Sequence, residues 1–427
     1  MSHRVLLYGA TGYSGRLIAA EGERHGMTDA NRAAGYRMIL GGRHGRELSR
    51  LGREHGMEHR VFGLEHPREV ARQLADVDVV INAAGPFAMT AVRLAKRALD
   101  AGSHYVDING EAEVYMRLDD LGLYAAQRNL AMVCSCGHTA AASDLLLHAA
   151  LATIGDSSRE ARGQRRPELG AVRIAASRPV NLSRGSLETV CRSIREQVRV
   201  VRMGDVEGRR EHERRTVFWY EPVGKLERSF DFGNYDRKSG PAAVAPAKRP
   251  DLRIASAANL VDTLTARLTI DRRGFAVHRI ESYVEAGTIA RLGYQVGAFL
   301  APFTAMRWTR DLVRLQLNLL PEGPTARDRE AEGHAVILDI EDPFQERILD
   351  WLWHTPNPYD FTTRVVVETA KRVARSELSG WLTPSEVLQP SKQELTANDG
   401  HLRGCRLDER RTGVVRRSDG AVLAGNV

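Results

Sequence analysis

A glycine-rich turn close to the N-terminus constrains the fold of this chain more than any other segment. It follows the apolar run 5–7 directly and precedes the apolar helix start 17–20. Glycines spaced in this way permit a tight strand-to-helix turn and let backbone N–H groups approach a pyrophosphate at the positive end of the helix. The segment therefore predicts a nucleotide site formed by Gly9, Thr11, Gly12, Tyr13, Ser14 and Gly15.

Strand-like and helix-like segments alternate from residue 4 to about residue 137. Such alternation is typical of a parallel sheet wrapped by helices. Six strands joined by crossover helices predict an α/β fold of the doubly wound Rossmann type. The expected strands are 4–7, 37–42, 59–62, 77–82, 104–107 and 131–134, and the expected helices run from the glycine turn to about 24 and over 46–55, 67–74, 90–101 and 114–129.

The pattern changes after residue 137, and a length of 427 residues favours two domains. A polar, arginine-rich connector at 156–167 precedes segments that predict a mixed sheet in a second, α+β domain. Residues 359–378 are amphipathic, and residues 391–427 are polar and aperiodic, so we expect a loose tail there. The segments that favour β-structure are 171–175, 216–220, 263–270 and 335–340.

Composition limits which kinds of partner and which cellular compartment this protein can have. The formal net charge is +7, but the arginines are scattered, which favours solvated faces and loops over a nucleic-acid interface, and an anionic cofactor or substrate is a second sufficient reason for the basic balance. Four cysteines in a chain of this length do not predict a disulfide framework. We find neither a signal segment nor an uninterrupted apolar stretch of about 18 residues. The sequence therefore predicts a cytoplasmic protein without a transmembrane segment.

The end of the second expected strand bears on cofactor choice. NAD-binding enzymes place an acidic residue there for the ribose 2′-hydroxyl, whereas this chain reads Gly-Gly-Arg-His over 41–44. A guanidinium cannot accept a hydrogen bond from a hydroxyl, but it pairs well with a phosphate. We therefore predict NADP(H), with Arg43 at the 2′-phosphate and Arg46 as a second donor.

Two further segments end expected strands at the same sheet edge, where ligands of open parallel sheets collect. Small residues at Ala83, Ala84, Gly85 and Pro86 predict the place of the nicotinamide ribose. The segment 104–111 supplies the side chains of Tyr105, Asp107 and Glu111 as candidates for proton transfer. The two carboxylates equally fit a second role, which is to cap the next helix.

The segment 134–138 closes the sixth strand. Cys134 and Cys136 lack further ligands at zinc spacing, so buried thiols are favoured over a metal site. His138 is a candidate proton donor, and Ser143-Asp144 is typical of a helix start. Four signatures are missing from the sequence: Tyr-x-x-x-Lys of short-chain dehydrogenases, His-Glu-x-x-His, Gly-x-Ser-x-Gly and the P-loop lysine.

Together these residues resemble the saccharopine-dehydrogenase-like oxidoreductases, in particular the branch that contains trans-acting enoyl reductases. The resemblance implies NADPH, a nucleotide domain (1–137 plus 359–390) completed by a returning C-terminal helix, and a substrate and dimerisation domain (138–358). Departures lie where substrate would approach, at His138, Ala142 and 183–186. The matching segments are 9–16, 41–43, 82–87, 104–111, 137–145, 323–324, 335–340 and 380–384.

We therefore expect an NADPH-dependent reductase that acts on a polarised C=C or C=N bond of a natural-product or lipid-type small molecule, as a homodimer. Two other functions stay open. One is a non-catalytic NADP-binding sensor, and the other is an aldehyde or acyl-phosphate dehydrogenase with Cys136 as nucleophile. The apolar segment 292–306 predicts core packing first, and otherwise a substrate tunnel, a dimer surface or a peripheral membrane contact.

Overall fold

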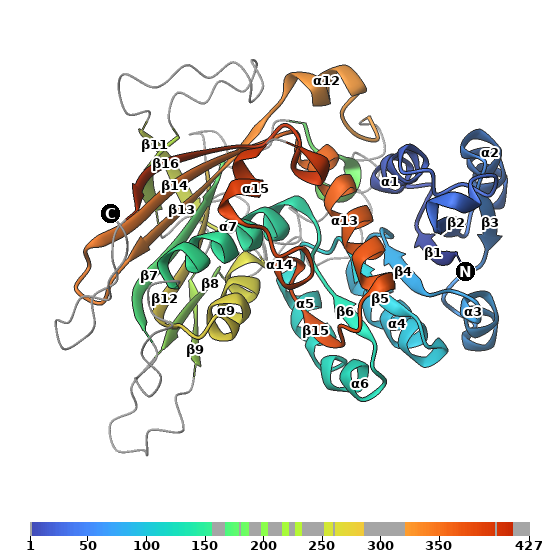
Figure 1. Ribbon diagram of the computed structural model, residues 1–427, viewed down its shortest axis with the longest axis horizontal. Coiled ribbons are helices and arrows are strands. Elements are labelled where there is room, and N and C mark those ends of the chain that lie inside the picture. The colour runs from blue at the N-terminus through green and yellow to red at the C-terminus, as the bar shows by residue number, and fades with distance from the viewer. Residues whose placement is uncertain are drawn as a thin grey trace, which may run out of the picture. The chain divides into compact units, whose positions relative to one another are not determined.

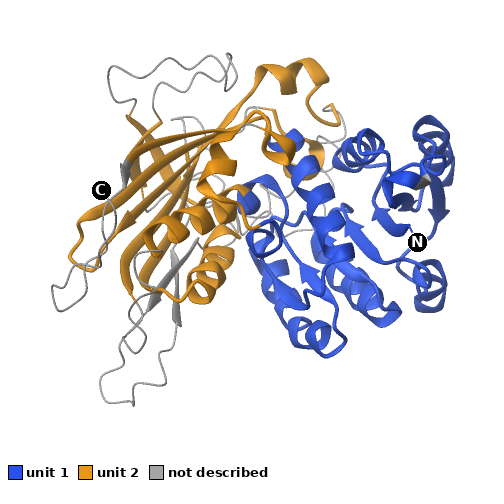
Figure 2. Ribbon diagram, viewed as in Figure 1, with its two compact units in different colours: residues 1–141, 358–388 blue, residues 142–357, 389–427 orange. Residues whose placement is uncertain are grey.

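The computed structural model divides the chain into two compact units. One unit holds residues 1–141 and 358–388, and the other holds residues 142–357 and 389–427 (Figure 2). The residues that the structure describes are 2–155, 167–178, 181–187, 198–203, 216–221, 227–232, 252–258, 261–285, 321–397 and 399–412. Residues 156–166 of the expected connector (156–167) and the apolar segment 292–306 lie outside the described residues.

The first unit is built on a seven-stranded sheet in which every pairing is parallel. The strand order is β15-β6-β5-β4-β1-β2-β3, so the order reverses between β1 and β4 (Figure 1). Ligands of doubly wound sheets bind outside the carboxyl ends of the strands at such a switch point. The strands are β1 His3–Tyr8, β2 Tyr36–Gly42, β3 Glu58–Val61, β4 Val79–Asn82, β5 His104–Asp107, β6 Ala131–Val133 and β15 Gly380–Leu382.

The crossover helices follow the sequence prediction with one difference. The expected helix 114–129 is two helices, because the chain breaks at residues 120–121. Gly56 and Gly102 end α2 and α4 in the left-handed conformation, which suits glycine. The helices of this part are α1 Tyr13–Arg24, α2 Gly45–His55, α3 Pro67–Leu74, α4 Phe87–Ala101, α5 Ala112–Asp119 and α6 Gly122–Gln127, with the 3-10 helix η1 Arg32–Ala34.

A C-terminal segment returns to this unit and adds the seventh strand. Helix α13 (Pro358–Arg375) is followed by β15, which pairs with β6, and by α14 (Pro384–Leu388). Trp381 of β15 is buried, and its Nε1 donates to the Tyr115 hydroxyl at 3.2 Å. The amphipathic pattern at 359–378 predicts the helix, whereas the short strand has too few residues for a periodicity signal.

The second unit contains a nine-stranded mixed sheet. Its central strands β7 and β12 run parallel, and the other pairings are antiparallel, as expected for an α+β domain. The strands are β7 Glu168–Ala176, β8 Val198–Met203, β9 Thr216–Glu221, β10 Glu227–Asp231, β11 Leu252–Ala257, β12 Ala276–Glu285, β13 His334–Glu341, β14 Arg347–Thr355 and β16 Arg406–Thr412. The other elements are α9 Asp262–Arg272, α12 Ala326–Ala331, α15 Lys392–Ala397 and η4 Gly400–Leu402. Helix α7 (His138–Gly155) begins in the first unit and ends in the second.

Two predictions for this half of the chain are wrong. Residues 263–270 form helix α9 instead of a strand, because the helix places Thr263, Thr265 and Thr269 in the buried interior and Thr265 Oγ1 donates back to the Asp262 carbonyl at 3.1 Å. Ser143-Asp144 lies inside α7 rather than at a helix start, and the Asp144 carboxylate accepts a hydrogen bond from Thr269 of α9.

The prediction of a loose tail from residue 391 is also wrong for the part of the tail that the structure describes. Residues 392–397 form α15, and β16 pairs with β14 as an additional strand of the mixed sheet. Trp353 of β14 is fully buried, and its Nε1 donates to the Leu395 carbonyl at 3.4 Å. The polar composition of this segment gives no strand signal, because β16 forms by pairing with the free edge of β14. The composition of the segment itself carries no information about that edge. Residues 413–427 lie outside the described residues.

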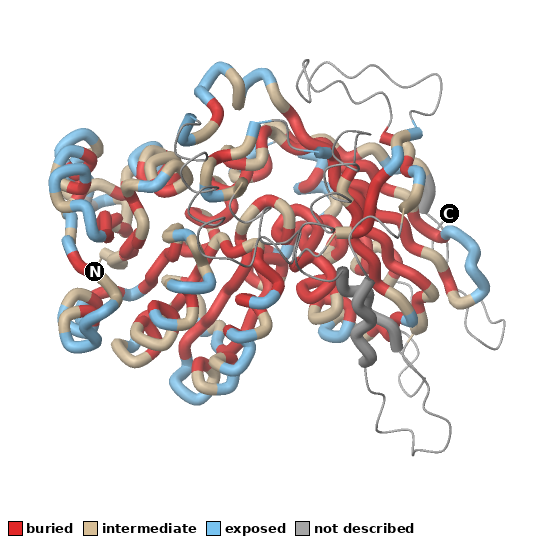
Figure 3. The backbone as a smooth tube through the Cα atoms, turned by 180° about the vertical axis from the view of Figure 1, so that it is seen from behind, coloured by how far each residue is buried: buried red, intermediate tan, exposed pale blue. Residues whose placement is uncertain are grey.

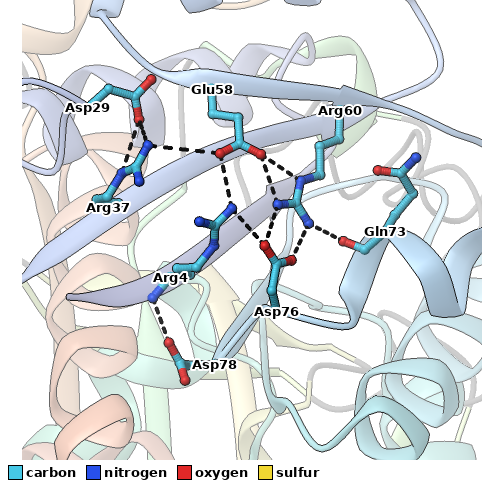
Figure 4. A network of polar contacts seen from close by, with 8 residues as sticks. All are labelled: Arg4, Asp29, Arg37, Glu58, Arg60, Gln73, Asp76 and Asp78. Atoms are coloured by element: carbon cyan, nitrogen blue, oxygen red, sulfur yellow. Dashed lines mark hydrogen bonds and ion pairs between the residues drawn. The ribbon is translucent and has the colours of Figure 1, made fainter. Parts of the chain in front are cut away.

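Burial concentrates in the strands of both sheets (Figure 3). The amino ends of β1–β3 carry a network of ion pairs instead of a ligand site (Figure 4). Arg60 pairs with Glu58 and Asp76, and Arg4 pairs with the same two carboxylates. Within the described part of the chain, no helix combines the length and the apolar character needed to cross a bilayer.

Candidate functional site

The glycine turn after β1 is fixed to the end of β2. The N–H groups of Gly9 and Ala10 both donate to the Gly41 carbonyl, at 2.9 and 3.2 Å. Gly9 has a φ of 89°, and a Cβ there would lie 2.7 Å from Ala84 N. A Cβ on Gly15 would collide with the Gly9 carbonyl. The first and third glycines are therefore required by the packing of the turn itself.

Two other glycines are not required by their neighbours. Gly12 is exposed, and a Cβ there would meet only the Gly9 carbonyl, at 3.3 Å. A Cβ on Gly85 would meet no described atom within 4 Å. These two positions are bare backbone at the carboxyl ends of β1 and β4, where a dinucleotide would approach most closely. Gly12 is the N-cap residue of helix α1, so it supplies no side-chain cap, and the first turn of the helix contains no acidic residue. The turn thus fits a pyrophosphate.

The two arginines after β2 differ from those at the opposite end of the strands. Arg43 and Arg46 are exposed, and neither has an ion pair with any residue that the structure describes. By contrast, Arg4, Arg37 and Arg60 are paired with carboxylates in the network of Figure 4. The guanidinium groups at the carboxyl end of β2 are therefore available to an external anion.

Arg43 also has an aromatic neighbour at the end of β1. Burial raises the pKa of Tyr8 to about 12, and the positive charge of Arg43 opposes this rise. The Tyr8 hydroxyl donates to the Phe62 carbonyl at 3.4 Å, and the two rings lie 5.1 Å apart. The sequence places Tyr8 directly before the glycine turn but predicts no binding role for it, because a tyrosine at this position also fits a strand.

The segment 83–86 after β4 is held from several sides. Ala83 N donates to the Tyr8 carbonyl at 2.9 Å, and Ala84 N donates to Asn82 Oδ1 at 3.0 Å. The Thr90 hydroxyl donates to the Ala84 carbonyl at 2.6 Å. We call residues 83–86 the β4 loop. Its backbone lies directly beside Gly9, so the glycine turn and this loop form one continuous surface.

Tyr105 and Asp107 lie beneath this surface and are fully buried. Asn82 Nδ2 donates to the Tyr105 hydroxyl at 3.0 Å, and this hydroxyl donates to Asp107 Oδ2 at 3.1 Å. Asp107 Oδ1 accepts two backbone hydrogen bonds, from Asn109 N at 3.0 Å and Ser135 N at 2.8 Å. Burial raises the pKa of Asp107 from 3.8 to about 6. Burial also holds the pKa of Tyr105 well above its usual range.

The loop after β5 is folded by its own side chains. Asn109 Oδ1 accepts from Glu111 N at 2.9 Å, and Asn109 Nδ2 donates to the Glu111 carbonyl at 3.1 Å. Glu111 is 8% exposed, and its Oε1 accepts from Phe87 N at 3.3 Å at the start of α4. Glu111 thus caps α4, which precedes it, whereas its side chain makes no capping hydrogen bond to α5, which follows it.

The segment after β6 contains the fourth predicted catalytic residue, His138. It begins α7 and is 6% exposed; its backbone N donates to Thr362 Oγ1 at 2.9 Å. Its ring lies edge-on to Phe361 of α13, with the ring centres 5.0 Å apart. Cys134 and Cys136 are fully buried thiols outside any disulfide, and burial raises the pKa of Cys134 well above its usual range. No group of three or more metal-binding side chains occurs among the described residues.

Helix α13 also reaches the glycine turn. The ring of Tyr359 lies edge-on to that of Tyr13, with the centres 5.0 Å apart. Of the four predicted catalytic residues, Glu111 and His138 retain some exposure, whereas Tyr105 and Asp107 are enclosed in hydrogen bonds. The amides of Asn82 and Asn109, which complete these contacts, were not assigned a role from the sequence. The signal that could have found them is an asparagine in the loop that follows a strand, because its side chain commonly accepts a hydrogen bond from the backbone N–H two residues on, as Asn82 does from Ala84 and Asn109 does from Glu111.

Comparison with known proteins agrees with this geometry. Residues 5–133 match the family model described as the saccharopine dehydrogenase NADP binding domain. A search of curated proteins found no match. Among solved structures, the apo saccharopine dehydrogenase (L-Glu forming) of Saccharomyces cerevisiae is 11% identical with a TM-score of 0.58, and the match covers 96% of this chain and 99% of that chain.

A second solved structure is the homospermidine synthase of Legionella pneumophila in complex with NAD. It is 9% identical with a TM-score of 0.52, and the match covers 96% of this chain and 91% of that chain. At such identities the two structures establish the shared fold, and the domain match establishes the cofactor class. Residues 5–133 therefore form a saccharopine-dehydrogenase-like NADP-binding domain, and the chain as a whole shares the fold of these two structures.

Proposed function

We propose that this protein is an NADPH-dependent reductase that adds hydrogen across a polarised C=C or C=N bond of a small molecule. The observation that carries the proposal is the bare backbone at Gly12 and Gly85, together with the exposed guanidinium groups of Arg43 and Arg46, which form no ion pair with any residue described in the structure. Bare backbone accommodates the pyrophosphate and the nicotinamide ribose, and the arginines accommodate a 2′-phosphate.

The roles of the chain's own residues follow from their placement. Gly9 and Gly15 shape the turn, while Thr11, Gly12, Tyr13 and Ser14 face the pyrophosphate. The β4 loop, with Ala83, Ala84, Gly85 and Pro86, supports the nicotinamide ribose. When bound, the reduced nicotinamide supplies hydride from its C4 atom. The electron pair of the substrate's double bond moves to its other atom, which then takes a proton from His138 or Glu111, and solvent replaces that proton.

Tyr105 and Asp107 take a different role from the one predicted. Both side chains are fully buried and hydrogen-bonded to protein groups, so neither reaches a substrate. We assign them to positioning. Complete burial of Cys136 also disfavours the alternative in which this thiol attacks an aldehyde. Loss of two of the four catalytic candidates favours a non-catalytic NADP-binding protein as the second candidate function.

The first test is a screen of NADPH oxidation with enoyl-thioesters, imines and carbonyl compounds. We expect turnover with one of the first two classes. Tight NADPH binding without turnover in any class would contradict the reductase and support the sensor. A homodimer and a cytoplasmic location belong to the same proposal, and sedimentation of the purified protein tests the dimer.

The second test addresses cofactor choice. Arg43→Ala should weaken NADPH binding by roughly tenfold to a hundredfold, because it removes a charge-assisted hydrogen bond to phosphate worth about 1.5–3 kcal/mol. NADH, which lacks the 2′-phosphate, should bind with nearly unchanged affinity. Calorimetry with both nucleotides measures the ratio, and Arg72→Ala on the exposed face of α3 is the control. Equal losses for the two nucleotides would refute the assignment of Arg43.

A further inference from the structure

A series of hydrogen bonds joins the β4 loop to Asp107, and each group in it donates toward Asp107. Asp107 Oδ1 faces two backbone N–H groups, which can only donate. At the other end, Ala84 N can also only donate, so Asn82 presents Oδ1 to it and Nδ2 to the Tyr105 hydroxyl. The hydroxyl must then donate to Asp107 Oδ2. We call this sequence of groups, from Asp107 through Tyr105 and Asn82 to Ala84, the relay.

The relay is complete only when Asp107 is ionised. A proton on Asp107 has to sit on Oδ2, because Oδ1 already accepts two hydrogen bonds. It then competes with the Tyr105 proton for a single contact between two oxygens. One of the two protons loses its oxygen acceptor inside a fully buried site and is left with at best the Cys134 thiol, a weak acceptor, and an unmade hydrogen bond is costly there. The Tyr105 hydroxyl can escape this conflict only by moving away from Asn82 or Asp107.

We propose that Asp107 is a positioning residue whose carboxylate, acting through Tyr105 and Asn82, holds the β4 loop in the conformation that receives the nicotinamide end of the cofactor, and that protonation of this carboxyl loosens the loop. The inference rests on the proposed function for the place of the cofactor. The loop order itself depends only on contacts within the first unit.

The surroundings of Asp107 place its titration in an accessible pH range. Burial raises the pKa of Asp107 to about 6, and hydrogen bonds from Ser135 N, Asn109 N, Tyr105 and Cys134 lower it. The ionisable groups that face it are Tyr105 on β5 and Cys134 after β6, while Cys136 and Asp119 of α5 act on Cys134. Loop order and cofactor affinity should therefore rise as the pH increases through about 6.

The effect of Asp107 on the unfolding free energy should change with pH in the opposite direction to its effect on cofactor affinity. The folded-state pKa of Asp107 lies above the value of 3.8 for an unfolded chain, so the folded protein binds this proton more tightly. The contribution of Asp107 to the unfolding free energy accordingly falls as the pH rises from about 4 to about 6. A merely structural carboxyl would show only this trend, whereas the relay predicts a cofactor affinity that moves the other way.

Asp107→Asn is the informative variant. Its Oδ1 can keep both backbone hydrogen bonds, and its amide nitrogen then donates to Tyr105, which imitates protonated Asp107 at every pH. Tyr105→Phe breaks the relay at its centre. Tyr124→Phe is the matched control, because Tyr124 donates to Asp100 at 2.8 Å elsewhere in the same unit.

The experiment is calorimetry with NADP⁺ from pH 5 to pH 8. We expect both Asp107→Asn and Tyr105→Phe to bind roughly tenfold more weakly than the wild type at pH 8, as for the loss of one hydrogen bond, and nearly equally at pH 5. The 2′-phosphate of the cofactor titrates near pH 6 as well, so the ratio between variants at each pH is the quantity that matters. A ratio that stays constant with pH would overturn the proposal.

Hydrogen exchange of residues 83–87 without cofactor provides a second readout. After correction for intrinsic rates, protection of the Ala84 amide should fall below pH 6 in the wild type and be low at all pH values in Tyr105→Phe. Unchanged protection in that variant would overturn the relay even if it binds cofactor poorly. Absence of NADP⁺ heat in the wild type would instead refute the proposed function, and the exchange data would still decide on the relay.

Discussion

At the residue scale, the glycines of the first turn are needed for different physical reasons, as Gly15 and Gly12 show. Gly15 is required by its own surroundings, since a Cβ would collide with the Gly9 carbonyl at the base of α1. At Gly12 a Cβ would make one tight contact, 3.3 Å from the Gly9 carbonyl, rather than a collision, and its absence leaves exposed backbone toward a ligand. The common spacing of glycines therefore combines one folding requirement with one binding requirement.

This distinction predicts different outcomes for two identical substitutions. Gly15→Ala should lower the free energy of unfolding by roughly 1–3 kcal/mol, because overpacking forces the turn apart. Gly12→Ala should change stability by less than about 0.5 kcal/mol but weaken NADP⁺ binding at least tenfold. Urea unfolding and calorimetry on both variants separate the effects. Equal stabilities of the two variants would show that the turn is looser than its contacts suggest.

At the scale of elements, the two ends of the first three strands are specialised for different tasks. The amino ends carry mutually neutralised charges, with Arg60 bonded to Glu58, Asp76 and the Gln73 carbonyl (Figure 4). The carboxyl ends carry bare backbone and arginines with no described ion pair. The network fixes β1, β2 and β3 to one another at the end away from the site.

Arg60→Met should lower the unfolding free energy by roughly 1 kcal/mol, because the ion pairs of Arg60 are partly exposed and screened by solvent. The hydrogen bond from Arg60 holds the pKa of Asp76 below its usual range. The contribution of this hydrogen bond to the unfolding free energy is therefore present above the unfolded-state pKa of Asp76 and is lost as the pH falls through the folded-state pKa. The difference between wild type and variant should shrink below about pH 4. Arg72→Met on α3 is the control, and a pH-independent difference would contradict this account.

At the scale of the whole molecule, each unit is completed by sequence from far along the chain. Residues 358–388 supply α13 and the seventh strand of the first sheet, and residues 406–412 supply β16 of the second. Tyr36 near the start of the chain shows the first connection directly, since its hydroxyl donates to the Lys371 carbonyl at 2.9 Å and its ring lies 4.4 Å from the Arg375 guanidinium.

A chain that ends at Gln389 should fold its first unit but expose the edge of β14. Unpaired edge strands promote association, so this variant should form larger species by light scattering at concentrations where the full chain does not. NADP⁺ binding should persist, because the first unit keeps both of its segments. A truncated chain that stays as soluble as the full one would show that β16 is dispensable.

The sequence alone determined the elements whose cause is local. Alternating apolar strands and capped helices predict six of the seven strands of the first sheet, and the glycine turn and Arg43 predict where an anionic dinucleotide would lie. Tertiary structure decided what depends on neighbours distant in sequence. Strands β15 and β16 exist because an unpaired edge is present for each, and α9 forms because buried threonines face α7. Tyr105 and Asp107 are enclosed in hydrogen bonds because the sheet brings Asn82, Asn109 and Ser135 around them, and this enclosure is the basis on which we propose a positioning role for both. Hydrogen-bond partners and burial are properties of the folded chain, and they separate a carboxylate that acts on substrate from one that holds a loop.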